Sequence, residues 1–281
     1  MGGEKVMSRT ILAFALAGSL LGFSAASAIA ADEHEGPLPP KQKWSFSGPF
    51  GHWDKAQLQR GFKVYREVYG VCHGLNLLSF RNLADLGFSE AQIKTIAAEY
   101  KVQDGPNDQG DMFERNGRPA DRFPAPWPNE NAARSRYNGV PPDFSVLAKA
   151  RTYERGFPLF ILDIFTQFQE QGVDYIHALM TGYKDKAPAG FSLPQGSFYN
   201  EYFPGHALAM PPPLSDKRVD YSDGSPTTVD QYAKDVAAFM MWAAEPTLET
   251  RKRVGFQVMI FLLVLAGLLY FTKKKVWADA H

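Results

Sequence analysis

The single cysteine of this 281-residue chain is followed directly by a histidine, in the pair Cys72–His73. This pair is the second half of the Cys-x-x-Cys-His motif, in which two thiols attach a haem covalently and the histidine binds its iron. Tyr69 stands three residues before Cys72, where that motif has its first cysteine. The pattern therefore predicts a c-type haem held by one thioether, and the alternative is an ordinary loop histidine beside a free thiol.

An electron-transfer haem needs a second axial ligand, and Met210 is the best candidate for it. Three prolines at 211–213 follow Met210, and they hold the backbone extended, which fixes an otherwise flexible thioether. His206 is a competing ligand, and so is His177, although His177 is expected to pack on its own helix. A methionine packed inside a loop is the alternative interpretation of Met210.

Haem propionates are anions, so the ring edge needs cationic or hydrogen-bonding partners. Arg151 follows the run 141–145, which begins with two prolines, and is the best-placed cation. A solvated surface arginine is the alternative. Met180, Met240 and Met241 lie on apolar helical patterns, where core packing is the expected role.

Helical segments must position these residues, and the chain has five stretches of helical periodicity, at 54–70, 89–101, 143–152, 157–182 and 228–244. The first leads directly to Cys72, with Asp54 as its expected N-cap. Ser89 with Gln92, and Thr228 with Gln231, have the spacing of a capping box. The stretches 103–142 and 184–227 carry most of the prolines and predict long irregular loops, which are expected where a large flat cofactor is wrapped.

The N-terminal residues 1–31 have the pattern of an export signal. A basic start and a short apolar stretch precede Ala28-Ile29-Ala30, a small-residue cleavage site. Met7 is an alternative start. We therefore expect residues 32–250 to form an exported body.

The other end predicts a membrane anchor. Residues 254–272 carry no charge, and 19 residues are about the length of one crossing. We assign 251–275 to the anchor and 276–281 to a cytoplasmic tail. Basic residues flank both ends of the apolar run, so the export signal decides the orientation.

The charge of the exported body bears on its partners. The chain has 30 basic and 30 acidic residues, of which eight basic and two acidic lie outside 32–250, so the body carries a net charge of about −6. An acidic body favours a basic protein partner over nucleic acid. A single cysteine excludes an intramolecular disulfide, and a body of this length is long enough to be stabilised by a hydrophobic core.

Beyond these residues, much of the chain resembles the cytochrome c1 family, the membrane-anchored haem subunit of the cytochrome bc1 complex. The resemblance covers nearly the whole body and the anchor, and its segments occur in family order. They are 59–68, 112–113, 123–129, 138–143, 149–151, 181–183, 199–205, 209–214, 233–236, 242–246 and 251–253.

The resemblance implies a mostly α fold, in which a class I cytochrome c-like domain with long loops carries one C-terminal transmembrane helix. It implies one haem c per chain, attached at Cys72, with His73 and Met210 as axial ligands, Arg151 at a propionate, and Asn138 and Tyr175 near the haem.

The resemblance also implies a role in electron transfer from the Rieske iron–sulfur protein to a soluble cytochrome c. The implied partners are cytochrome b and membrane lipid, in a complex that is expected to be dimeric. We expect a single-pass protein of the bacterial inner membrane, with its main domain in the periplasm. It is not expected to bind nucleic acid or to catalyse a reaction by itself.

Two features depart from the family pattern. Tyr69 replaces the first cysteine, and residues 152–174, which include the apolar run 157–162, resemble an insertion. The missing cysteine keeps open a haem-free structural subunit as an alternative function. An anchored cytochrome of another respiratory complex is the second alternative.

Overall fold

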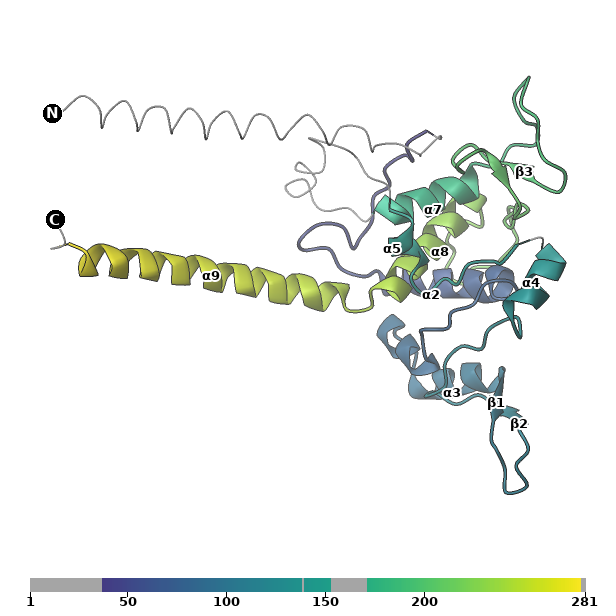
Figure 1. The fold of residues 1–281 in the computed structure, drawn as a ribbon, viewed down its shortest axis with the longest axis horizontal. Coiled ribbons are helices and arrows are strands. Elements are labelled where there is room, and N and C mark those ends of the chain that lie inside the picture. Colours follow the sequence, from purple (N-terminus) through teal and green to yellow (C-terminus); the bar gives the residue numbers. More distant parts are fainter. Residues whose placement is uncertain (1–36, 138, 153–170, 279–281) are drawn as a thin grey trace, which may run out of the picture. The chain divides into compact units, whose positions relative to one another are not determined.

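The computed structural model describes residues 37–137, 139–152 and 171–278, and this part of the chain is mostly helical (Figure 1). The predicted fold class is therefore confirmed. The helical elements are α2 (Lys55–Val64), the π-helical turn η1 (Tyr65–Tyr69), the 3-10 helix η2 (Phe80–Leu86), α3 (Glu90–Ala98), α4 (Glu130–Tyr137), α5 (Leu147–Ala150), α7 (Gln171–Thr181), α8 (Val229–Ala244) and α9 (Leu248–Val276). Two antiparallel strand pairs join β1 (Lys101–Asp104) to β2 (Phe113–Asn116) and β3 (Phe198–Tyr199) to β4 (Ala207–Leu208).

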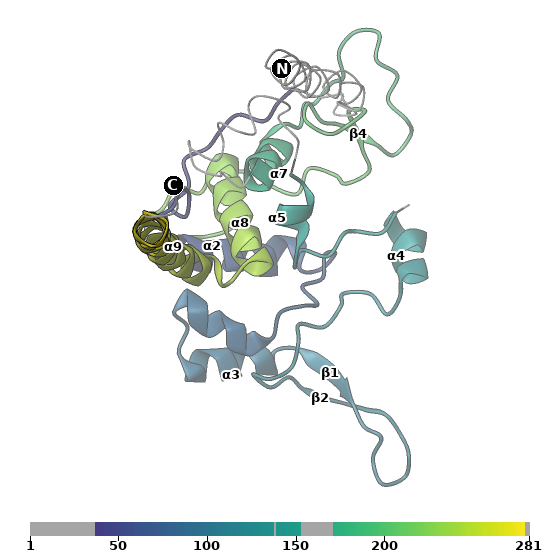
Figure 2. The same cartoon turned by 60° about the vertical axis from the view of Figure 1, so that its left-hand side comes forward.

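Helix α8 is the centre of the core. It packs against α2, α5 and α7, which lie beside it in both ribbon views (Figures 1 and 2). Phe239 of α8 packs 5.6 Å from the ring of Phe62 and 5.7 Å from the ring of Tyr65. This packing fixes the end of α2 and η1, the segment that leads to Cys72.

Helices α2 and α8 approach each other most closely at Gly61. A Cβ atom at Gly61 would lie 2.1 Å from the carbonyl oxygen of Asp235, so no other residue fits there. The fully buried Asp235 carboxylate accepts a hydrogen bond from Arg60 Nε at 2.9 Å. A charged hydrogen bond thus supports the contact beside the glycine.

Two of the three predicted helix caps agree with the structure. Asp54 caps α2, and Ser89 forms a reciprocal capping box at the start of α3. At α8, Thr228 Oγ1 accepts from the N–H of Gln231 at 3.3 Å, but the Gln231 side chain donates to Asp235 instead of returning to the cap. The predicted second capping box is wrong because a buried carboxylate is the stronger acceptor.

The predicted irregular stretches are less irregular than expected. Residues 103–142 contain β2 and α4, and residues 184–227 contain β3 and β4. The helix expected at 143–152 is only the single turn α5. Ala133 is the one buried residue of α4, so no apolar stripe marked this helix in the sequence.

Several predictions fall outside the described residues. They concern the export signal at 1–31, Asn138, the run 157–162 and most of the apparent insertion. The described part of the helix predicted at 157–182 is α7, and it ends at Thr181.

The C-terminal helix α9 contains the predicted apolar run and is long and apolar enough to cross a membrane. Its first turn is tied to the domain through Glu245, a largely buried residue after α8. Glu245 accepts from Lys149 Nζ at 2.7 Å and from Arg251, and Lys252 donates to the carbonyl of Phe46. These contacts connect the beginning of α9 to α5 and to the N-terminal segment of the domain.

We predict that Glu245→Gln lowers the free energy of unfolding at pH 7 by about 2 kcal/mol, because two charged hydrogen bonds weaken. Burial acts to raise the pKa of Glu245, but the hydrogen bonds from Arg251 and Lys149 outweigh it and hold the pKa below its ordinary value. The carboxylate therefore stabilises the fold at pH values above the ordinary pKa of glutamate. This stabilisation is lost as the pH falls through the depressed pKa of Glu245.

Urea unfolding of the detergent-solubilised protein at several pH values measures this effect. The difference in the free energy of unfolding between wild type and Glu245→Gln should shrink as the pH falls below the ordinary pKa of glutamate. Glu130→Gln is the matched control, since Glu130 forms an exposed pair with Arg134 one turn away on α4. An equal loss in both variants would contradict a special role for Glu245.

Candidate functional site

A cavity of about 510 Å³ lies beside the Cys72–His73 pair. Its wall contains residues from η1, α5, α7 and α8 and from the proline-rich segments 139–142 and 208–213. Most of these side chains are apolar. The cavity brings together five of the six predicted site residues, Cys72, His73, Arg151, Tyr175 and Met210.

The local fold buries His73 and fixes its ring. The backbone N–H groups of Cys72 and His73 donate to the carbonyl of Tyr69 at 2.9 and 2.8 Å, which turns the chain sharply after η1. The His73 ring packs 4.4 Å from Phe144, and its Nδ1–H donates to the carbonyl of Pro142 at 2.8 Å. This hydrogen bond leaves Nε2 unprotonated, as a metal ligand must be.

Burial also lowers the pKa of His73, although the hydrogen bond to Pro142 opposes that effect. The ring is therefore neutral at physiological pH. A neutral, oriented imidazole at a cavity wall has the form of a metal ligand.

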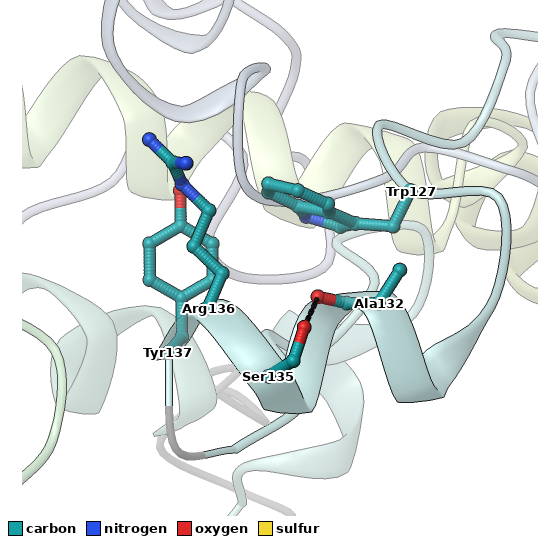
Figure 3. A pocket seen from close by; sticks show the side chains of 5 residues that line it. All are labelled: Trp127, Ala132, Ser135, Arg136 and Tyr137. Atoms are coloured by element: carbon teal, nitrogen blue, oxygen red, sulfur yellow. Dashed lines mark hydrogen bonds between the residues drawn. The ribbon is translucent and has the colours of Figure 1, made fainter.

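Cys72 is a free, partly buried thiol held by two aromatic residues. Its Sγ–H donates to the hydroxyl oxygen of Tyr137 at 3.2 Å, and its carbonyl accepts from Trp127 Nε1 at 3.3 Å. The two rings meet edge to face at 5.3 Å and line a second, open pocket along α4 (Figure 3). Neither contact was predicted, because Trp127 lies in a proline-rich run and α4, which ends at Tyr137, was not expected from the sequence.

Tyr69 occupies the position of the missing cysteine and is almost fully buried. Its hydroxyl donates to Met180 Sδ at 2.9 Å, and its ring packs 5.5 Å from Phe144. Burial raises the pKa of Tyr69 well above its ordinary value, so the phenol stays protonated. Position 69 therefore contributes a core hydrogen bond and no nucleophile.

Three methionines line the cavity, and their surroundings differ. The sulfur of Met180 accepts the hydrogen bond from Tyr69, and Met240 is buried within α8. Met210 is partly buried, and its backbone carbonyl accepts from Tyr183 Oη at 3.1 Å. That bond fixes the main chain of Met210 and leaves its thioether for another partner.

The two competing histidines lie outside the cavity wall. His177 is buried on α7, and its Nε2–H donates to Asp230 at 2.9 Å. His206 Nδ1–H donates to the carbonyl of Asn200 at 3.1 Å, and its ring stacks on Tyr199 at 5.5 Å. Both side chains are thus engaged elsewhere in the fold.

Two arginines line the cavity. Arg151, directly after α5, is exposed and lines the wall, and so does Arg218, which the sequence did not single out. Burial raises the pKa of Tyr175, and the charge of Arg151 partly offsets this, so the two side chains lie near each other. The cavity therefore combines apolar walls, a nitrogen and a sulfur donor, and basic groups. These features fit a flat apolar macrocycle that carries an iron and carboxylates.

The model of the cytochrome C1 family matches residues 44–280. Cytochrome b/c1 of Bradyrhizobium diazoefficiens is 56% identical over 99% of this chain, which spans 41% of that longer protein. Cytochrome c1 of Blastochloris viridis is 52% identical over 90% of this chain and 91% of its own length. The mitochondrial cytochrome c1 heme protein of Saccharomyces cerevisiae is 41% identical over 90% of this chain and 76% of its own length. The chain therefore belongs to the cytochrome c1 family.

Proposed function

We propose that this chain is the electron-transfer haem subunit of a cytochrome bc1 complex and binds one haem c through Cys72 alone. One observation carries this proposal: a single cavity wall contains Cys72, the neutral ring of His73 and Met210. The yeast relative is named a heme protein, and the Bradyrhizobium relative is named for cytochromes b and c1 together.

Each site residue has a distinct role in this proposal. Cys72 would hold the porphyrin by one thioether, and His73 Nε2 and Met210 Sδ would be the two iron ligands. Arg151 would neutralise a propionate, and Tyr175 and Asn138 would be further haem-binding residues. The haem, when bound, supplies a one-electron couple whose potential a Met/His pair raises.

We further propose that electrons arrive from the Rieske iron–sulfur protein and leave to a soluble cytochrome c. The acidic body, with a net charge of about −6 over residues 32–250, favours a basic electron acceptor and speeds its encounter. Cytochrome b and membrane lipid surround α9 in a dimeric complex. The chain carries electrons and performs no bond chemistry by itself.

The proposed location follows from the two ends of the sequence. Residues 1–31 direct export, 32–250 lie in the periplasm, 251–275 cross the bacterial inner membrane and 276–281 remain inside. The long apolar helix α9 supports a single-pass anchor.

Covalent haem attachment tests the proposed function. Haem should remain with the purified protein after acid–acetone extraction, because a thioether survives that treatment. The α-band of the pyridine haemochrome should lie between the positions for two thioethers and for free haem, since one vinyl group remains unsaturated.

Three results would contradict this proposal. Extractable haem would show that Cys72 is not attached, and a protein without any haemochrome signal would favour a haem-free structural subunit. Purification without cytochrome b and the Rieske protein would favour a different respiratory complex. Intact-mass measurement of the mature chain checks attachment and removal of residues 1–31 together.

A further inference from the structure

Cys72 is held by two hydrogen bonds, one at its main chain and one at its thiol. Trp127 donates to the carbonyl of Cys72 at 3.3 Å, and the Cys72 thiol donates to the Tyr137 hydroxyl at 3.2 Å. Trp127 and Tyr137 also pack against each other at 5.3 Å. The main chain and the side chain of Cys72 are therefore restrained by one aromatic pair, which lies 55 and 65 residues further along the sequence.

Tyr137 stands at the boundary of the two pockets. It lines the cavity that contains His73 and also the open pocket on α4. In Figure 3 the indole of Trp127 lies next to the ring of Tyr137, and the Arg136 side chain extends beside Tyr137. The hydroxyl of Tyr137 thus holds the thiol at the cavity wall.

No second thiol assists Cys72, since the sequence contains a single cysteine. In the two-cysteine motif, attachment through one thiol holds the macrocycle close to the other. Here Tyr69 takes the first position, and its hydroxyl is engaged with Met180. The yield of attachment therefore depends on how well one thiol is oriented.

We propose that Tyr137 and Trp127 are positioning residues that orient the Cys72 thiol for formation of the single thioether. This inference rests on the proposed function, because it concerns how haem is attached in the same cavity. The Cys72 S–H adds across a vinyl double bond: sulfur bonds to the inner carbon and the hydrogen ends on the terminal carbon. The addition consumes no oxidant or reductant.

The test compares full-length wild type with Tyr137→Phe, Trp127→Phe and Ser135→Ala, each expressed with a c-type maturation system. Tyr137→Phe removes only the oxygen that accepts from the thiol. Ser135 is the matched control, since it lines the same pocket but donates to the Ala132 carbonyl of its own helix at 2.9 Å. The readouts are the share of chains with the mass of a haem adduct, the share of haem released by acid–acetone, and the thermal unfolding midpoint.

We expect the ratio of extractable to covalent haem to rise roughly fivefold in Tyr137→Phe, the factor for one lost neutral hydrogen bond. Trp127→Phe should also raise this ratio, and Ser135→Ala should leave it close to the wild-type value. The thermal unfolding midpoints of all three variants should stay close to that of wild type. Complete attachment in Tyr137→Phe would overturn the proposal, and so would an equal rise in Ser135→Ala. Wild type without covalent haem would instead contradict the proposed function, so the two failures are distinguishable.

Discussion

Replacing Met210 by lysine should lower the midpoint potential of the haem by on the order of 100 mV or more, because a thioether stabilises ferrous iron relative to a harder amine ligand. Haem content should remain nearly unchanged, since His73 and the Cys72 thioether do not depend on residue 210. Potentiometric titration of the purified protein measures the first quantity, and the pyridine haemochrome measures the second.

Met180→Leu is the informative control, because Met180 lines the same cavity. Its sulfur accepts from Tyr69, so this replacement should leave the potential close to wild type. An unchanged potential in Met210→Lys would rule out Met210 as the ligand. A fall in Met180→Leu instead would assign the sixth position to Met180.

Residues adjacent in sequence made much of the site predictable. Cys72 and His73 are neighbours, and the prolines after Met210 are local, so each signal is visible without a fold. The structure places these residues in one cavity wall with Arg151 and Tyr175. Their individual roles toward haem remain predictions.

The aromatic contacts to Cys72 were not predictable in the same way. Trp127 lies in a proline-rich run, and Tyr137 ends a helix whose residues are mostly polar. Neither residue has a periodic pattern, and only the tertiary fold brings them within hydrogen-bonding distance of residue 72. Such contacts are set by packing between distant segments, which sequence spacing does not encode.

A similar distinction applies to the fold. Helical segments with a continuous apolar stripe, such as α8 and the segment formed by α2 and η1, were predicted nearly to their ends. Short elements that bury little, such as α4 and the strand pair β1–β2, were missed. Gln231 also shows the limit of local patterns, because its side chain bonds to Asp235 across one turn and not to the predicted cap.

Gly61→Ala should destabilise the protein by ~3 kcal/mol, because the added methyl group overpacks the contact between two helices. The new Cβ would lie 2.1 Å from the Asp235 carbonyl oxygen and 2.7 Å from the Cβ of Phe239. The first contact is with helix backbone, which cannot move aside as a flexible side chain does. Helices α2 and α8 must therefore separate. Chemical unfolding in detergent measures the loss.

Gly255→Ala is the control, because a Cβ at Gly255 would meet no atom within 4 Å beyond its chain neighbours and its own helix backbone, and alanine favours a helix. It should leave unfolding of the domain unchanged. The separation caused by Gly61→Ala should also reduce covalent haem, since α2 leads into Cys72 while Val236 and Met240 of α8 line the same cavity. Unchanged stability in Gly61→Ala would contradict the close helix contact. Lost stability with full haem attachment would show instead that the cavity does not depend on that contact.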